Sequence, residues 1–190
     1  MEEIITSLQH WEAVRNNPDL LTQLFMNKLG FELDMSLFPS TIPLHAYAGV
    51  KDEELGFYVI SEVNDVDSEP EVLSSNCYWC PAVMAFGGGQ EIPEDEAVVR
   101  VNSWIDTFPD WIYQVVDMPF GMYQTFYIPT TDLQTQKYAA LFALKENVLF
   151  SEIKEADLVL TEDANVFYDT IRRQPPYAPY SNDYYILSLI

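Results

Sequence analysis

Two cysteines have the C-x-x-C spacing of redox and metal sites, in the segment Cys77-Tyr78-Trp79-Cys80-Pro81. A thioredoxin-type site needs its first cysteine at a helix N-terminus, where the helix dipole lowers the thiol pKa. This segment has the composition of a strand, in which residues three apart point to opposite faces. A zinc site would need two more ligands, and His10 and His45 are both distant in the sequence. We therefore expect Cys77 and Cys80 to be buried structural residues, with no redox or metal role.

Three consecutive glycines, Gly87-Gly88-Gly89, lie between an expected strand and an expected helix, where loops that bind phosphate occur. Neither G-x-x-x-x-G-K-[ST] nor G-x-G-x-x-G is present. Four acids follow closely, and their charge outweighs the positive end of a helix dipole: Glu91, Glu94, Asp95 and Glu96. The sequence predicts a flexible connection here and no nucleotide cofactor.

An alternation of acids from Asp65 to Glu71 is typical of calcium loops. The EF-hand template requires glycine at its sixth position and glutamate at its twelfth. Counting from Asp65, those positions hold Pro70 and Asn76, so the segment is interpreted as a solvated acidic loop without a metal.

The chain carries no motif of a nucleophilic hydrolase or a zinc protease. Neither G-x-S-x-G nor H-E-x-x-H occurs. His10 lies in an expected amphipathic helix and His45 in an expected strand, contexts in which a histidine is usually a packed or surface residue. Carboxylate pairs are too numerous to select a general acid and a general base, so no catalytic residue is assigned.

The charge balance is the most informative property of the chain. It holds 30 Asp and Glu against 9 Lys and Arg, a formal net charge of −21. The excess is greatest in residues 51–71, with eight acids and one lysine. Two loops there form a candidate acidic patch in one region, with the members Asp52, Glu53, Glu54, Asp65, Asp67, Glu69 and Glu71. Such a patch can steer a basic partner, although charged loops are also simply solvated.

This charge limits the classes of partner. Nucleic-acid and anionic-membrane binding rest on Lys and Arg, so neither a duplex nor a membrane surface is expected as a partner. The N-terminus is acidic where a signal peptide is basic, and no apolar run approaches the roughly 18 residues of a membrane span. Two cysteines make no disulfide framework. We expect a cytoplasmic protein.

Helices are expected in two regions. Ile4, Leu8 and Trp11 share one helical face, and Asn17-Pro18-Asp19 ends that helix and caps a second one, which Gly30 is expected to stop. A central helix begins after Pro93 with three acids in its first turn, and Pro109 is expected to start a second helix of the pair.

Strand-like runs occupy much of the remaining chain. Residues 42–50 and 55–60, joined by a polar loop at 51–54, are predicted to form a hairpin. Further strands are expected at 77–86, 122–128, 138–144, 156–160 and 184–189, and an extended connection at 175–180. The sequence predicts an α+β fold, with an N-terminal helical hairpin and a central helical pair packed on a mostly antiparallel sheet. Residues 1–190 are expected to form one domain, with the acidic connector 64–76 as a weak alternative boundary.

Three functions fit these observations. The first is a non-catalytic binding or inhibitor protein that docks a basic protein surface, as an immunity protein or a nucleic-acid mimic does; abundant Tyr and Trp suit an interface. The second is a small enzyme that uses carboxylates or the Cys77/Cys80 pair. The third is a structural or assembly component. The scarcity of histidine and of catalytic motifs favours the binding protein over the enzyme.

Overall fold

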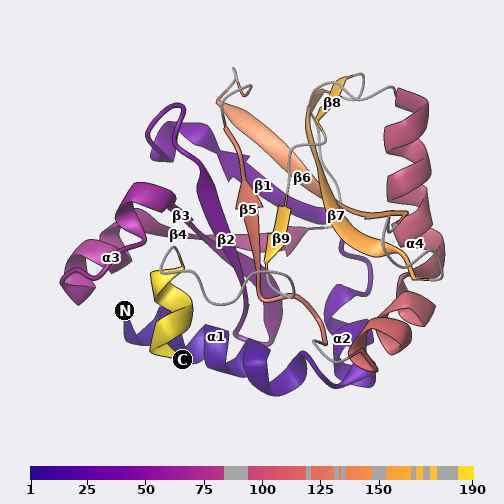
Figure 1. Ribbon diagram of the computed structural model, residues 1–190, viewed down its shortest axis with the longest axis horizontal. Helices are drawn as coiled ribbons and strands as arrows, with labels where there is room; N and C mark the ends of the chain where they lie inside the picture. The colour runs from indigo at the N-terminus through magenta and orange to yellow at the C-terminus, as the bar shows by residue number, and fades with distance from the viewer. Residues whose placement is uncertain are drawn as a thin grey trace.

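The computed structural model describes residues 1–83, 94–118, 121–130, 133, 136–146, 153–163, 166–168, 172–174 and 184–190. In these residues, four α-helices pack on a curled antiparallel sheet that resembles half of a barrel (Figure 1). The predicted α+β class is therefore confirmed. No helix in these ranges is both long enough and apolar enough to cross a membrane.

The sheet has the strand order β8-β7-β6-β1-β4-β3-β2-β5-β9, and all neighbouring strands are antiparallel. Two three-residue strands, β8 (Val166–Tyr168) and β9 (Arg172–Gln174), form its edges. The longer strands are β1 (Gly30–Asp34), β2 (Leu44–Lys51), β3 (Glu54–Ser61), β4 (Cys77–Val83), β5 (Thr125–Ile128), β6 (Lys137–Lys145) and β7 (Glu155–Asp163).

The N-terminal helical hairpin is confirmed as α1 (Glu2–Val14) and α2 (Pro18–Phe25). The Asn17 side chain accepts a hydrogen bond from the Leu20 N–H at 3.2 Å, as an N-cap residue does. Gly30 does not stop α2 as expected, because α2 ends at Phe25 and Gly30 belongs to β1. Only glycine fits there, since a Cβ atom on Gly30 would lie 1.8 Å from the Ala140 carbonyl oxygen.

The expected central pair of helices is one helix, α4 (Glu94–Val116), with Pro109 inside it. A proline in a helix removes one backbone hydrogen bond and favours a kink, and α4 bends along its length in Figure 1. The helix continues because Trp104 and Trp111, on either side of Pro109, are both buried in the same core. Packing therefore outweighs the local cost of the proline.

The hairpin of β2 and β3 is confirmed, and its turn is tighter than expected. Lys51 pairs with Glu54, which leaves two residues in the turn. Both have positive φ, 51° for Asp52 and 66° for Glu53, the conformation that a two-residue hairpin turn requires at its central positions.

Two segments differ from the prediction in type. The acidic connector contains a 3-10 helix, η2 (Glu62–Asn64), and a short helix, α3 (Pro70–Asn76). Residues 184–189, expected as a strand, contain the 3-10 helix η3 (Tyr185–Leu189). Strand β1 was not predicted. The triglycine at 87–89 and the proline-rich stretch at 175–180 lie outside the described residues.

Buried side chains gather on both faces of the sheet. On one face, Phe31, Phe57 and Phe142 join Phe25 of α2 and Trp104 of α4 in the main core. On the other, Tyr47, Tyr58 and Cys77 pack with Ile4 and Leu8 of α1 and with Ile186 and Leu187 of η3. This second cluster borders the polar site described next.

Candidate functional site

The acidic patch predicted from the sequence is divided by the structure. Asp52, Glu53 and Glu54 lie at the tip of the β2–β3 hairpin, whereas residues 65–71 follow the other end of β3. Eight residues of strand separate these ends, roughly 23 Å at about 3.3 Å per residue. The expectation of acidic loops in one region is therefore wrong, because an extended hairpin places its turn far from the segment that leaves it.

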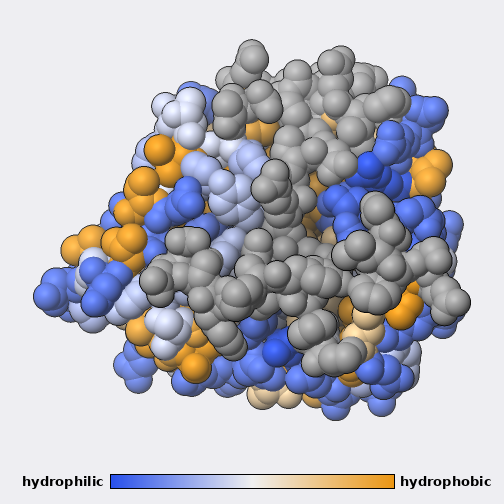
Figure 2. Space-filling model, in the orientation of Figure 1, coloured by the Kyte–Doolittle hydropathy of each residue, from blue (hydrophilic) through white to orange (hydrophobic). Residues whose placement is uncertain are grey.

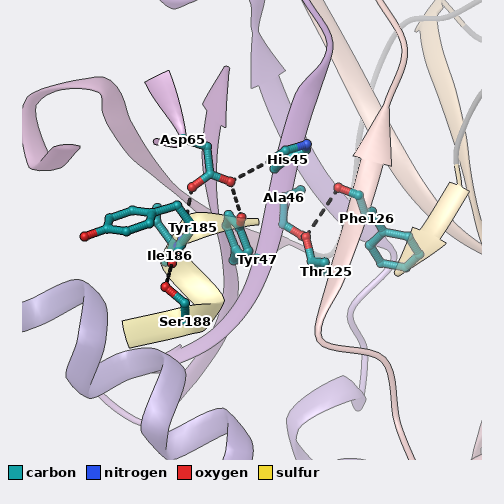
Figure 3. Close-up of polar contacts among 9 residues, drawn as sticks. All are labelled: His45, Ala46, Tyr47, Asp65, Thr125, Phe126, Tyr185, Ile186 and Ser188. Atoms are coloured by element: carbon teal, nitrogen blue, oxygen red, sulfur yellow. Dashed lines mark hydrogen bonds and ion pairs between the residues drawn. The ribbon is translucent and has the colours of Figure 1, made fainter. Parts of the chain in front are cut away.

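Asp65 corrects the predicted patch a second time, because it is buried with 1% of its surface exposed. Its carboxylate oxygen Oδ2 accepts hydrogen bonds from the Tyr47 hydroxyl and from His45, whose Nδ1 atom lies 2.6 Å away. Its Oδ1 atom accepts a hydrogen bond from the backbone N–H of Ile186 at 3.1 Å. Figure 3 shows these groups converging on Asp65 from β2 and η3. The carboxylate is thus a structural acceptor and does not belong to the solvent-exposed surface.

His45 is fully buried beside this carboxylate. Its ring lies 4.2 Å from the ring of Tyr184 and 5.9 Å from that of Tyr127, centroid to centroid. Because a carboxylate only accepts, Nδ1 carries a proton. Nε2 is buried and has no hydrogen-bond partner in the part of the chain that the structure describes.

Tyr47 completes the cluster from the same face of β2. Burial raises its pKa well above the usual value, and the adjacent Asp65 charge and hydrogen bond raise it further. The phenol therefore stays protonated and donates to Asp65 at any ordinary pH.

An imidazole oriented by a carboxylate through Nδ1 is the arrangement that general bases use in hydrolases. Such a base needs a nucleophile at Nε2, and the described residues provide no polar group within hydrogen-bonding distance of that atom. These contacts join three parts of the fold. Asp65 directly follows η2, and it binds His45 and Tyr47 of β2 and Ile186 of η3.

The two cysteines lie on opposite faces of β4. Cys77 belongs to the second cluster, while Cys80 packs against the main core. Both are free thiols. Burial raises the pKa of Cys80 to about 12 and that of Cys77 further, so neither forms a reactive thiolate near neutral pH.

The remaining acids of the connector lie in residues 62–76, which we call the acidic arm. Asp67, Glu69 and Glu71 are exposed there. The same segment carries three valines, on either side of these acids, with about half of their surface in water: Val63 at 54%, Val66 at 49% and Val72 at 48%. In Figure 1, α3 projects from one side of the molecule, and Figure 2 shows hydrophobic and hydrophilic side chains next to each other there. The arm is therefore an acidic surface with apolar positions inside it.

The arm is attached to the C-terminal residues. The Tyr185 hydroxyl donates to Asp67 at 2.8 Å, next to the contact between Ile186 and Asp65. Within the described ranges, no group of three or more His, Cys, Asp or Glu side chains could hold a metal ion, which includes the calcium-like segment that starts at Asp65.

Sequence reasoning missed the cluster of His45, Tyr47 and Asp65. His45 and Tyr47 share a face of β2, which the alternation of the strand residues predicts from the sequence. Nothing in the sequence distinguishes Asp65 from the acids around it, because its burial depends on η3, 120 residues later.

Comparisons with known proteins give no relative. No protein-family model matches the chain, and neither does any curated protein or any solved structure.

Proposed function

We propose that this chain is a non-catalytic binding or inhibitor protein, and that its acidic arm docks a basic surface of another protein. The observation that carries the proposal is the set of half-exposed valines among exposed acids on the arm. Interfaces commonly place apolar side chains at the centre of a charged or polar rim.

The arm favours one form of this proposal. A mimic of nucleic acid needs closely spaced negative charge without apolar interruptions. Val63, Val66 and Val72 interrupt the charge and supply area whose burial stabilises a complex, at about 25 cal/mol per Å2. A partner with a small apolar patch surrounded by Lys and Arg fits this surface best, as an immunity protein would require of a basic toxin.

The two acidic loops give a matched experiment. The partner is first captured from the native host and purified, and its affinity is then measured against two triple variants. The arm variant is D67N/E69Q/E71Q, and the hairpin variant is D52N/E53Q/E54Q. Each variant removes three charges, and the two sets of charges lie beyond opposite ends of β3. We expect the arm variant to slow association about tenfold at low salt, and the hairpin variant to leave it unchanged.

A second pair of substitutions tests the apolar part. V66S and V72S together should weaken the complex at least tenfold, mainly through faster dissociation, because both side chains are exposed in the free protein and are buried on docking. Equal effects of the arm and hairpin triples, or no effect of the valine substitutions, would overturn the arm as the docking surface.

An enzyme is the second candidate, and the cluster of His45 and Asp65 is the observation that favours it. The chain has two histidines, and His10 is exposed, so each protein molecule holds its own control. Diethyl pyrocarbonate acylates accessible imidazole nitrogens, and mass spectrometry locates the product. If His45 reacts as fast as His10 in the native protein, small molecules reach its Nε2 atom, and this result supports the enzyme hypothesis. Reaction at His10 alone, with both modified after unfolding, supports the structural role.

A further inference from the structure

The sheet separates between two of its central strands. β1 and β4 pair only at Gly30 with Val83 and Phe31 with Ala82, whereas β1 pairs with β6 over five residues and β4 with β3 over five. The next residue of β4 is Pro81, which has no N–H to donate to a neighbouring strand. The two strands therefore diverge beyond this point.

A groove of about 390 Å3 lies where they diverge, within the range of ligand sites. Its wall includes Glu32 and Asp34 from β1, Tyr78 and Trp79 from β4, and Phe38, which follows the 3-10 helix η1 (Met35–Leu37). β4 lies between β1 and β3 in the sheet, yet its residues 78–80 are only partly buried and Pro81 is exposed. The groove is therefore open to solvent, although β1 and β4 are interior strands of the sheet.

Backbone groups line this groove on both sides. Residues 32–34 pair with β6 on one edge, and among the described residues no strand pairs with their other edge. Unpaired strand edges bind extended peptides by main-chain hydrogen bonds, the mode called β-augmentation. β1 offers the better edge, since β4 has Pro81 in the corresponding stretch.

The charges and rings of the groove select the side chains of such a peptide. Glu32 is exposed, while Asp34 accepts hydrogen bonds from the hydroxyl and N–H of Ser36, which lower its pKa, as Lys137 does to a smaller degree. Lys137 stands opposite Asp34 on β6 and also lines the groove, so Asp34 is the carboxylate next to this cation and Glu32 is the exposed one. Tyr78 packs against the main core, as Phe31 and Leu33 of β1 do, whereas Trp79 lies on the other face with Glu32. The ring that can attract an ammonium or guanidinium group beside Glu32 is therefore that of Trp79.

We infer that this groove binds an extended basic segment of a protein partner. The segment's main chain pairs with the open edge of β1, and a Lys or Arg side chain lies beside Glu32 and the ring of Trp79. This inference rests on the proposed function and names the part of the basic partner that enters the fold. The arm leads directly into β4 through α3, so one partner can contact both surfaces.

The test uses a fluorescent nine-residue peptide of alternating lysine and valine, with fluorescence anisotropy on the full chain. The same peptide with alternate residues N-methylated keeps every charge and loses the N–H groups of one edge. We expect N-methylation to weaken binding at least tenfold. We expect E32K to weaken it about tenfold as well, and a peptide of alternating glutamate and valine not to bind.

A charge-matched control separates the groove from the general negative field of the protein. Glu146 is exposed and follows the end of β6 distant from Lys137 and the groove, so E146K should change affinity less than twofold. Equal binding of the N-methylated peptide, or an equal loss in E146K and E32K, would overturn the inference. If free arginine displaces the peptide at a concentration no higher than the peptide concentration that half-saturates the protein, the groove is a small-cation site and the inference is overturned. None of these results depends on the arm, so a failure here leaves the experiments on D67N/E69Q/E71Q and the valines intact.

Discussion

Replacing Asp65 with asparagine should reduce the stability of the fold by about 2–3 kcal/mol. The carboxylate accepts hydrogen bonds from three donors: the Tyr47 hydroxyl, His45 Nδ1 and the Ile186 N–H. An asparagine fills the same space, and its oxygen can still accept from Ile186. Its amino group is a donor, so it faces Tyr47 and His45 with the wrong polarity.

The magnitude follows from how these two partners respond. The Tyr47 hydroxyl can rotate and accept. A neutral His45 must move its proton to Nε2, which creates a buried N–H with no acceptor among the described residues. One unsatisfied donor costs about 1–3 kcal/mol, and the loss of charge-assisted bonds adds to it. D65A would leave all three donors unsatisfied, about 3–9 kcal/mol, a large part of the 5–15 kcal/mol of a typical domain.

Urea unfolding measures the effect, with D67N as the control. Asp67 also accepts a tyrosine hydroxyl but is exposed, so D67N should change stability by less than about 0.5 kcal/mol. The nitrogen chemical shifts of the two histidines report the tautomer directly, and D65N should change that of His45 alone. If D65N and D67N unfold at the same urea concentration, or the His45 tautomer is unchanged in D65N, the buried acceptor role assigned to Asp65 is refuted.

Three further results are expected from unfolding experiments. The fold raises the Cys80 pKa from 9.0 to about 12, so the unfolded chain loses this proton first as the pH rises. The contribution of Cys80 to stability is therefore full below pH 9 and is lost as the pH rises toward 12. In C80A the loss of stability at pH 10.5 should be smaller by about 2 kcal/mol. D52N/E53G should stabilise the hairpin by about 1 kcal/mol, since both positions have positive φ and Asn-Gly is the preferred pair there; a loss of stability would contradict that turn geometry. D157A should cost about 3 kcal/mol, because it removes a buried carboxylate 2.9 Å from Arg100, and a neutral result would show that this pair contributes nothing.

Local patterns predicted the elements whose structure depends on neighbouring residues. The capped start of α2 at Asn17-Pro18 and the hairpin of β2 and β3 were both readable, since capping and strand alternation act over a few residues. Pro109 misled the prediction for the opposite reason. Its local cost is real, and two tryptophans buried in the core outweigh it.

The errors in the site arise from contacts between distant residues. In the sequence, Asp65 looks like the solvated acids around it. It is buried because η3 places the N–H of Ile186, 121 positions later in the chain, against it. Strand β1 was missed because Gly30 resembles a helix stop, while its actual constraint is the close approach of Ala140 from β6. The opposite faces of Cys77 and Cys80, by contrast, follow from strand alternation alone.

The burial of Asp65 also decides how the negative charge can be tested. Neutralising all seven acids of the predicted patch together would remove surface charge and a buried hydrogen-bond acceptor in one step. A loss of binding in that protein would then report partial unfolding as readily as a lost contact. Variants that keep Asp65 and change only Asp67, Glu69 and Glu71 alter the surface while the contact with Ile186 holds the base of the arm in place. A binding loss in those variants, with an unchanged unfolding midpoint, can therefore be attributed to the charge of the arm itself.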